Sequence, residues 1–127
     1  MMKIVVDSSI LIDYLRNGTK WQDFLNNAPR DTELFLPTIV IFELFSGKSS
    51  KKNSASKDIV NLFKKFAQIE LTESIARKAG ELYRDIGKHI DAGDYIIAAS
   101  ALEIRGAILT LNKKHFKQIP NLSIYPL

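Results

Sequence analysis

Three acidic residues, Asp7, Glu43 and Asp94, have sequence neighbours that indicate a catalytic or metal-binding role. Asp7 follows a short apolar run, Glu43 interrupts the apolar stretch IVIFELF, and Asp94 precedes the apolar segment YIIAAS. A buried carboxylate must be paired, protonated or bound to metal, so the apolar neighbours of Glu43 favour a functional role over a solvent-exposed one. Asp7 and Asp94 also have structural interpretations, as part of a helix cap and as an acid in the first turn of a helix.

If these carboxylates converge, their repulsion raises their pKa values unless a cation neutralises them. Oxygen ligands and water suit a hard divalent ion, whereas zinc prefers imidazole or thiolate, and the chain has no cysteine and only two histidines. We therefore expect Mg²⁺ or Mn²⁺. Such an ion generates hydroxide from water and stabilises charge on a phosphoryl group, so the expected reaction is hydrolysis of a phosphodiester.

The elements that must position these residues can be read from hydrophobic periodicity and from turn residues. Short apolar runs predict strands at residues 3–6, 33–36, 68–71, 107–111 and 123–125. Helices are predicted at residues 10–16, 21–28, 38–47, 58–67, 73–86 and 91–106, with a helical turn at 113–116. Apolar strands that alternate with helices imply an α/β fold with a parallel sheet covered on both faces. Ligands bind beyond the carboxyl ends of such strands, where Asp7 and Asn112 are expected.

Local signals make further predictions about these helices. Ser8 or Ser9 is expected to cap the first helix, Thr72 to cap the helix at 73–86, and Gly106 to stop the helix at 91–106. The helix at 38–47 is expected to be largely buried because nearly all its side chains are apolar. Asp91 stands three residues before Asp94 and is interpreted first as the cap of that helix.

The bulk composition indicates one globular domain, because 127 residues suffice for a single core. The net charge of +4 is concentrated in residues 48–65, which contain six lysines and one aspartate. This segment is either a solvated loop leading into a helix or a surface that attracts polyphosphate. No apolar run approaches the ~18 residues of a membrane span, and no signal peptide is recognisable, so a cytoplasmic protein without membrane attachment is expected.

The sequence motifs of other enzyme classes are mostly incomplete or absent. Gly47-Lys48-Ser49 imitates the end of a phosphate-binding loop, but Phe42 stands where the first glycine is required. The sequence contains neither G-x-G-x-x-G nor G-x-S-x-G, which disfavours a dinucleotide site and a serine hydrolase. Ser9 stands where a haloacid-dehalogenase-like phosphatase would have its second aspartate.

Four segments carry a family resemblance: VVDSS at residues 5–9, FEL at 42–44, DYIIAASA at 94–101 and LTLNKKHF at 109–116. In order and spacing they resemble the PIN domain, specifically the VapC toxins of type II toxin-antitoxin pairs. The resemblance covers essentially the whole chain and implies a single PIN domain at residues 1–127, built as a three-layer α/β/α sandwich. It also implies an endoribonuclease that uses Mg²⁺ or Mn²⁺, forms a homodimer and is silenced by a cognate VapB-like antitoxin.

The same resemblance assigns roles to individual residues. Asp7 and Asp94 become the principal metal ligands, and Glu43 either binds metal through water or orients the nucleophile. Ser9 is a secondary polar contact. Asn112 occupies the fourth acidic position of the family, where it is a weak ligand that removes one negative charge and puts a second metal in doubt. Asp91 is a weak candidate to restore that charge.

Other functions remain open from the sequence. Lys48, Lys51, Lys52, Lys113 and Lys114 are candidates to guide an RNA backbone to a ribonuclease site. A PIN-like scaffold that binds RNA or protein without turnover is the alternative that Asn112 suggests. An enzyme that acts on DNA or phosphomonoesters would share the same site residues.

Overall fold

The computed structural model describes residues 2–127, except the side chains of Lys48 and Ser49. Its described residues form one sheet with the strand order β3-β2-β1-β4-β5, in which all neighbours are parallel. The strands are β1 (Lys3–Val6), β2 (Glu33–Pro37), β3 (Ala67–Ile69), β4 (Ala107–Leu109) and β5 (Ser123–Ile124). The predicted parallel sheet is therefore confirmed, with shorter third, fourth and fifth strands than the apolar runs suggested.

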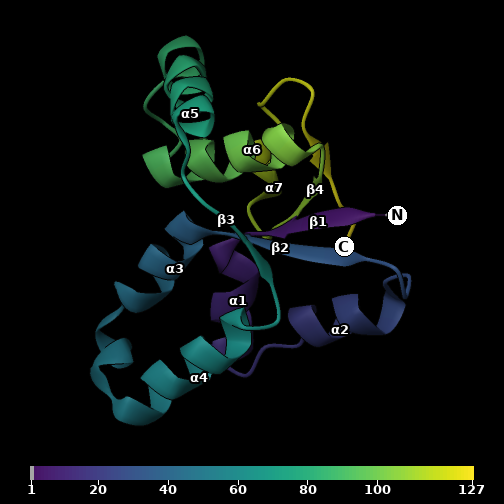
Figure 1. Ribbon diagram of the computed structural model, residues 1–127, viewed down its shortest axis with the longest axis vertical. Helices are drawn as coiled ribbons and strands as arrows, with labels where there is room; N and C mark the ends of the chain where they lie inside the picture. Colours follow the sequence, from purple (N-terminus) through teal and green to yellow (C-terminus); the bar gives the residue numbers. More distant parts are fainter. Residues whose placement is uncertain (1) are drawn as a thin grey trace.

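Helices cover both faces of this sheet, which confirms the three-layer α/β/α architecture (Figure 1). The helices are α1 (Ser8–Leu15), α2 (Lys20–Asn27), α3 (Thr38–Phe45), α4 (Asn53–Phe63), α5 (Glu73–Ile86), α6 (Ala92–Ile104) and α7 (Lys113–Phe116), with a 3₁₀ turn η1 (Lys48–Lys51). Helices α1 to α4 lie on one side of the sheet and α5 to α7 on the other (Figure 1). Much of the lysine-rich segment predicted as a loop is therefore helical, within η1 and the start of α4.

The strand order places a topological switch between β1 and β4. The chain moves from β1 outward through β2 to β3, then returns to the other side of β1 with β4 and β5. The connections that follow β1 and β4 run toward opposite edges of the sheet, which opens the crevice where α/β folds bind ligands. Asp7 directly follows β1, and its N–H donates to the carbonyl of Leu109, the last residue of β4, at 3.0 Å.

Three local predictions about the helices were wrong. The N-cap of α1 is not Ser8 or Ser9 but Asp7, which agrees with the structural interpretation of Asp7, although its side chain makes no capping hydrogen bond. Arg105, in the left-handed conformation with φ of 57°, ends α6, so Gly106 follows the stop instead of making it. Helix α3 is not largely buried: it packs through Val40 and Leu44, whereas Phe42 is 67% exposed.

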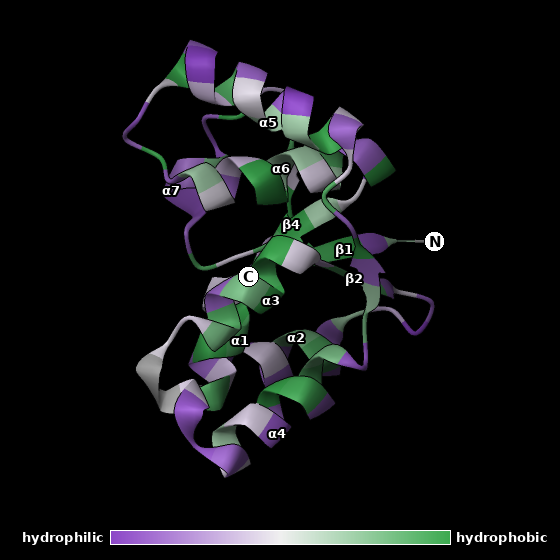
Figure 2. Ribbon diagram, turned by 60° about the vertical axis from the view of Figure 1, so that its left-hand side comes forward, coloured by the Kyte–Doolittle hydropathy of each residue, from purple (hydrophilic) through white to green (hydrophobic). Residues whose placement is uncertain are grey.

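Other helix predictions are confirmed. The Oγ1 of Thr72 accepts a hydrogen bond from the N–H of Ile75 and caps α5, whose Ile75, Ala79 and Leu82 are buried. The hydropathy colouring shows green, apolar strands enclosed between helices that carry purple, polar residues (Figure 2). Among the described residues, no helix combines the length and apolar character needed to cross a membrane.

Candidate active site

Asp7 lies at the switch between β1 and β4 with a side chain that is only 1% exposed. Its Oδ2 accepts hydrogen bonds from Ser9 Oγ and from Thr110 Oγ1, both at 2.7 Å. Its Oδ1 is buried and has no hydrogen-bond partner. An unpaired buried oxygen on a carboxylate is costly unless a donor or a cation binds it, so Asp7 Oδ1 is a candidate ligand for a cation.

The segment that follows β4 holds the two hydroxyl groups in place. The N–H of Leu111 donates to Ser9 Oγ at 3.0 Å, and the N–H of Asn112 donates to Thr110 Oγ1 at 2.9 Å. Each hydroxyl thus accepts from the backbone and uses its own hydrogen to bond Asp7. This arrangement fixes the orientation of the Asp7 carboxylate.

Glu43 projects from α3 and supplies the second orphaned oxygen, because its buried Oε1 has no hydrogen-bond partner. The pKa of Glu43 is raised from 4.5 to about 7, chiefly by burial and next by the negative charge of Asp7. Asp94 and Asp91 add smaller effects in the same direction, and a hydrogen bond from Ser8 opposes them. Since Coulomb effects of this kind require short range, Glu43 lies in the same acidic cluster as Asp7 and Asp94.

Asp94 is the third residue of α6 and is 7% exposed. Its Oδ2 lies 2.9 Å from Nδ1 of His115 in α7. Burial raises the pKa of Asp94, and the nearby charge of Asp7 raises it too, whereas the hydrogen bond to His115 lowers it. Two of the three carboxylates therefore carry perturbed pKa values, which is a frequent feature of functional sites.

Comparison with known proteins places this geometry in a family. The family model described as "PIN domain" matches residues 4–122. The chain belongs to the PIN-domain family. It is 34% identical to Ribonuclease VapC10 of Mycobacterium tuberculosis, over 94% of this chain and 90% of that protein. It is 29% identical to Ribonuclease VapC1 of Methanocaldococcus jannaschii, over 96% of this chain and 85% of that protein.

Solved structures show the same PIN fold. VapBC2 from Rickettsia felis, bound to a DNA fragment from its promoter, has a TM-score of 0.83 at 22% identity, with 98% of both chains covered. VapBC-1 from nontypeable Haemophilus influenzae has a TM-score of 0.80 at 22% identity, covering 98% of this chain and 97% of that one. The predicted family and fold are therefore confirmed.

The PIN fold of this chain brings Asp7, Glu43 and Asp94 into one electrostatic cluster. In residues 2–127, however, no group of three or more acidic, histidine or cysteine side chains forms a ready-made metal shell. Mg²⁺ usually keeps several waters and takes only one or two carboxylates from a protein. The two orphaned oxygens on Asp7 and Glu43 therefore fit a hydrated hard cation.

The two weaker candidates of the PIN site are placed differently. Asp91 is the N-cap residue of α6, yet its side chain makes no capping hydrogen bond, and its charge acts on both Glu43 and Asp94. The prediction that Asp91 is the cap residue of α6 is therefore confirmed for its position, without a capping bond from its carboxylate, and its charge does reach the acidic cluster. Asn112 is exposed and heads α7 without a side-chain cap bond, so its role as a ligand stays a prediction.

Four residues around the PIN site were not singled out from the sequence. Thr110 and Ser8 donate to the acidic cluster, His115 contacts Asp94, and Gly93 lies against Glu43. Thr110 and His115 lie in the segment LTLNKKHF, but the family resemblance assigned a role there only to Asn112. A hydroxyl residue directly after a predicted strand is a weak signal that could have drawn attention to Thr110, but it does not show that Thr110 contacts Asp7.

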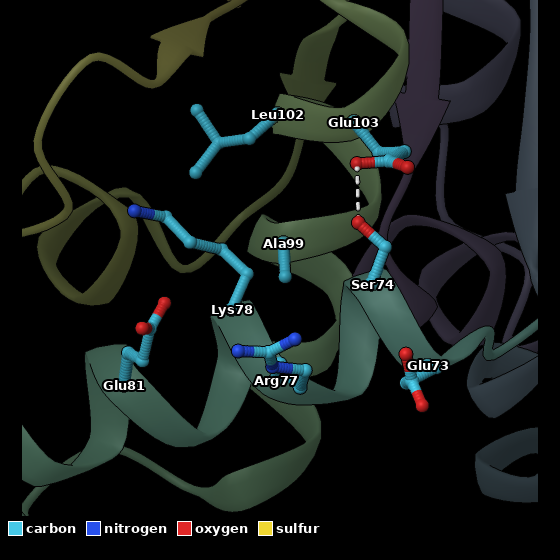
Figure 3. A pocket seen from close by; sticks show the side chains of 8 residues that line it. All are labelled: Glu73, Ser74, Arg77, Lys78, Glu81, Ala99, Leu102 and Glu103. Carbon is cyan, nitrogen blue, oxygen red and sulfur yellow. Dashed lines mark hydrogen bonds between the residues drawn. The ribbon is translucent and has the colours of Figure 1, made fainter.

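A hollow of about 460 Å³ lies away from the acidic cluster, between α5 and the second half of α6 (Figure 3). Arg77, Lys78 and Glu81 come to it from α5, and Leu102 and Glu103 come from α6. Leu102 follows Asp94 by eight residues, which is roughly 12 Å along a helix axis. Side chains of both charge signs line this hollow, so it favours no single class of ligand.

Proposed function

We propose that this chain is a metal-dependent endoribonuclease and the toxin of a type II toxin-antitoxin pair. The observation that supports this most is the pair of buried, unpartnered carboxylate oxygens, Asp7 Oδ1 and Glu43 Oε1, within one acidic cluster. The cluster lies beyond the ends of β1 and β4, where an α/β fold binds its ligands.

Mg²⁺ or Mn²⁺ is the proposed ion, held by Asp7 and Asp94, with Glu43 bound directly or through water. All three donors are carboxylates, which these hard ions prefer. His115 does not change this choice, since its Nδ1 is engaged by Asp94. When bound, such an ion neutralises charge on a phosphoryl group and lowers the pKa of a coordinated water.

The side chains of this protein would position the attacking water, accept its proton and hold the metal ligands in place. A water oxygen bonds to phosphorus, the bond from phosphorus to the leaving ribose oxygen breaks, and the leaving oxygen takes a proton from solvent. Glu43, whose carboxylate has a buried oxygen without a partner beside Asp7 and Asp94, orients the attacking water and accepts its proton. Asp7 is held rigidly by Ser9 and Thr110, which limits its reorganisation during the reaction.

RNA as substrate follows from the relatives, several of which are named ribonucleases. A structural neighbour, VapC20 of Mycobacterium tuberculosis, is described as a toxin that cleaves the sarcin-ricin loop. A VapB-like antitoxin is the proposed partner and a homodimer the proposed assembly, because the neighbours are largely toxin-antitoxin complexes.

The test is cleavage of a mixed pool of structured RNAs by the purified protein in Mg²⁺, Mn²⁺ or EDTA. The variants are Asp7→Asn and Asp94→Asn, with Asp23→Asn as a matched control on α2, outside the acidic cluster. We expect metal-dependent fragments from the wild type and the control, and a loss of at least about 100-fold in both site variants.

Three other outcomes would change or exclude the assignment. RNA that binds in Mg²⁺ but stays intact under every condition would favour a non-catalytic scaffold. Cleavage of DNA or phosphomonoesters in place of RNA would keep the site and change the substrate. Cleavage that survives in EDTA or in Asp7→Asn would exclude the proposed chemistry.

A further inference from the structure

We propose that His115 is a positioning residue, whose Nδ1–H fixes the Asp94 carboxylate so that its other oxygen is presented to the metal. This inference rests on the proposed metal site. Metal-binding side chains are commonly oriented by a neighbouring hydrogen-bond donor, and loss of that donor weakens metal binding by about 10- to 100-fold.

The contact itself is short and specific. Nδ1 of His115 lies 2.9 Å from Oδ2 of Asp94, and Asp94 receives no other side-chain hydrogen bond from the described residues. An ionised carboxylate can only accept, so Nδ1 must carry the hydrogen whenever Asp94 is charged. With Oδ2 occupied, Oδ1 is the oxygen left for a cation.

The fold holds the imidazole in this position. Helix α7 is only four residues long, but the residue after His115, Phe116, is fully buried and anchors the helix in the core. Ile119, 3% exposed, continues this anchor beyond the helix. The His115 side chain is 39% exposed, so solvent would leave it free to rotate if Asp94 did not bind it.

Asp7 and Asp94 are supported in the same way. Asp7 has its Oδ2 occupied by Thr110, and Asp94 has its Oδ2 occupied by His115. Thr110 and His115 belong to one short stretch that follows β4. This stretch therefore orients both proposed principal ligands. Thr110 donates a hydrogen bond that fixes the Asp7 carboxylate, and His115 does the same for the Asp94 carboxylate.

His115 is less suited to be a ligand itself. Its Nδ1 is hydrogen-bonded to Asp94, so this nitrogen is not available to a cation. A simple surface ion pair also describes it poorly, because the Asp94 side chain is only 10% exposed. The contact is an oriented hydrogen bond to a buried carboxylate.

The test is the affinity of the full chain for Mn²⁺, measured by calorimetry or by the spin resonance of free Mn²⁺. His115→Phe keeps a ring without a donor, whereas His115→Asn keeps a donor on the atom bonded to Cγ and loses the ring. His89→Phe is the matched control, because His89 bonds Gln118 and not the acidic cluster. Thermal unfolding of each metal-free variant checks that the fold is intact.

We expect His115→Phe to weaken Mn²⁺ binding by about tenfold or more, His115→Asn to stay within about threefold of the wild type, and His89→Phe to have no effect. Equal binding by wild type and His115→Phe would overturn the inference and leave the metal site standing. Equal weakening in His115→Phe and His115→Asn would overturn the role of the donor. A wild type that binds no Mn²⁺ would overturn the proposed metal site together with this inference.

A second readout does not depend on metal. Nitrogen-15 spectra of the two histidine rings in the metal-free protein near neutral pH report which ring nitrogen carries hydrogen. We expect a hydrogen on Nδ1 of His115 in the wild type and its redistribution toward Nε2 in Asp94→Ala. An Nδ1 without hydrogen in the wild type would overturn the assignment of the donor.

Discussion

Gly93 lies so close to Glu43 that a Cβ atom built on the glycine would stand 2.9 Å from Oε2 of the glutamate. This distance is shorter than van der Waals contact, so a side chain at position 93 and the present position of Glu43 are incompatible. Gly93 is the second residue of α6, one residue before Asp94. The absence of a side chain there lets the start of α6 approach α3 and brings Asp94 and Glu43 into one cluster.

Gly93→Ala is therefore expected to separate activity from stability. Alanine favours a helix over glycine by up to about 1 kcal/mol, and the flexible end of Glu43 can move away, so the free energy of unfolding should change by less than about 1 kcal/mol. RNA cleavage should fall by about tenfold or more because Glu43 is displaced. Urea unfolding and cleavage rates measure the two effects.

Gly80→Ala is the matched control, since a Cβ at Gly80 in α5 meets nothing within 4 Å. It should raise the free energy of unfolding by about 0.5 to 1 kcal/mol and leave cleavage unchanged. Full cleavage activity in Gly93→Ala would show that the position of Glu43 does not matter to the reaction.

Thr110→Val tests how Asp7 is held. Thr110 is fully buried, donates to Asp7 Oδ2 and accepts from the N–H of Asn112, and valine of similar shape loses both bonds. We expect about 1 to 3 kcal/mol of lost stability and Mn²⁺ binding weakened by about tenfold. Thr110→Ser keeps the hydroxyl and should bind Mn²⁺ nearly as the wild type does. Equal binding by the valine variant would leave Ser9 as the sufficient partner of Asp7.

The sheet could be predicted from the sequence because strands buried on both faces appear as continuous apolar runs. KIVV at residues 3–6 coincides with β1, and Asp7 at its end is where ligands bind in such folds. Helix α3 shows the limit of this argument. IVIFELF is apolar apart from Glu43, but only Val40 and Leu44 of α3 are buried, and Phe42 is left largely exposed.

The partners of the acidic residues could not be predicted from local patterns. Thr110 stands 103 positions after Asp7, and His115 stands 21 positions after Asp94, so only the folded chain shows that they touch. The close approach of Gly93 to Glu43 is of the same kind, because it depends on how α3 and α6 pack. The acids were recognised by their apolar neighbours, whereas the residues that orient them carry no comparable local signal.

The raised pKa of Glu43 predicts how the metal-free protein responds to pH. The folded carboxyl group binds its proton with a pKa of about 7, against 4.5 as the ordinary value. The folded state therefore holds more protons than the unfolded state between these values, and stability falls as pH rises through this window. Burial of Asp94, which raises its pKa, acts in the same direction.

In EDTA, the free energy of unfolding should be higher at pH 5 than at pH 8, and the part due to Glu43 is about 1 to 2 kcal/mol after allowance for solvent screening of a half-buried group. Glu43→Gln should remove that part, whereas Glu103→Gln, at an exposed glutamate, should not. Mg²⁺ should stabilise the wild type most at pH 8, where the carboxylates are ionised. A pH dependence that is the same in Glu43→Gln would contradict the assignment.

Lys113 and Lys114 are expected to contribute to the salt dependence of RNA binding. They directly precede His115 in α7, so they carry positive charge next to the acidic cluster. Each lysine that contacts a phosphate of a single strand contributes about 0.7 to the slope of log affinity against log salt concentration. Lys113→Gln with Lys114→Gln should thus weaken binding and reduce the slope by up to about 1.4.

Arg77→Gln with Lys78→Gln, at the hollow between α5 and α6, is the control, because it removes the same charge elsewhere and should leave the slope nearly unchanged. Equal reductions in both double variants would mean that net charge alone, rather than contact beside the site, attracts the RNA.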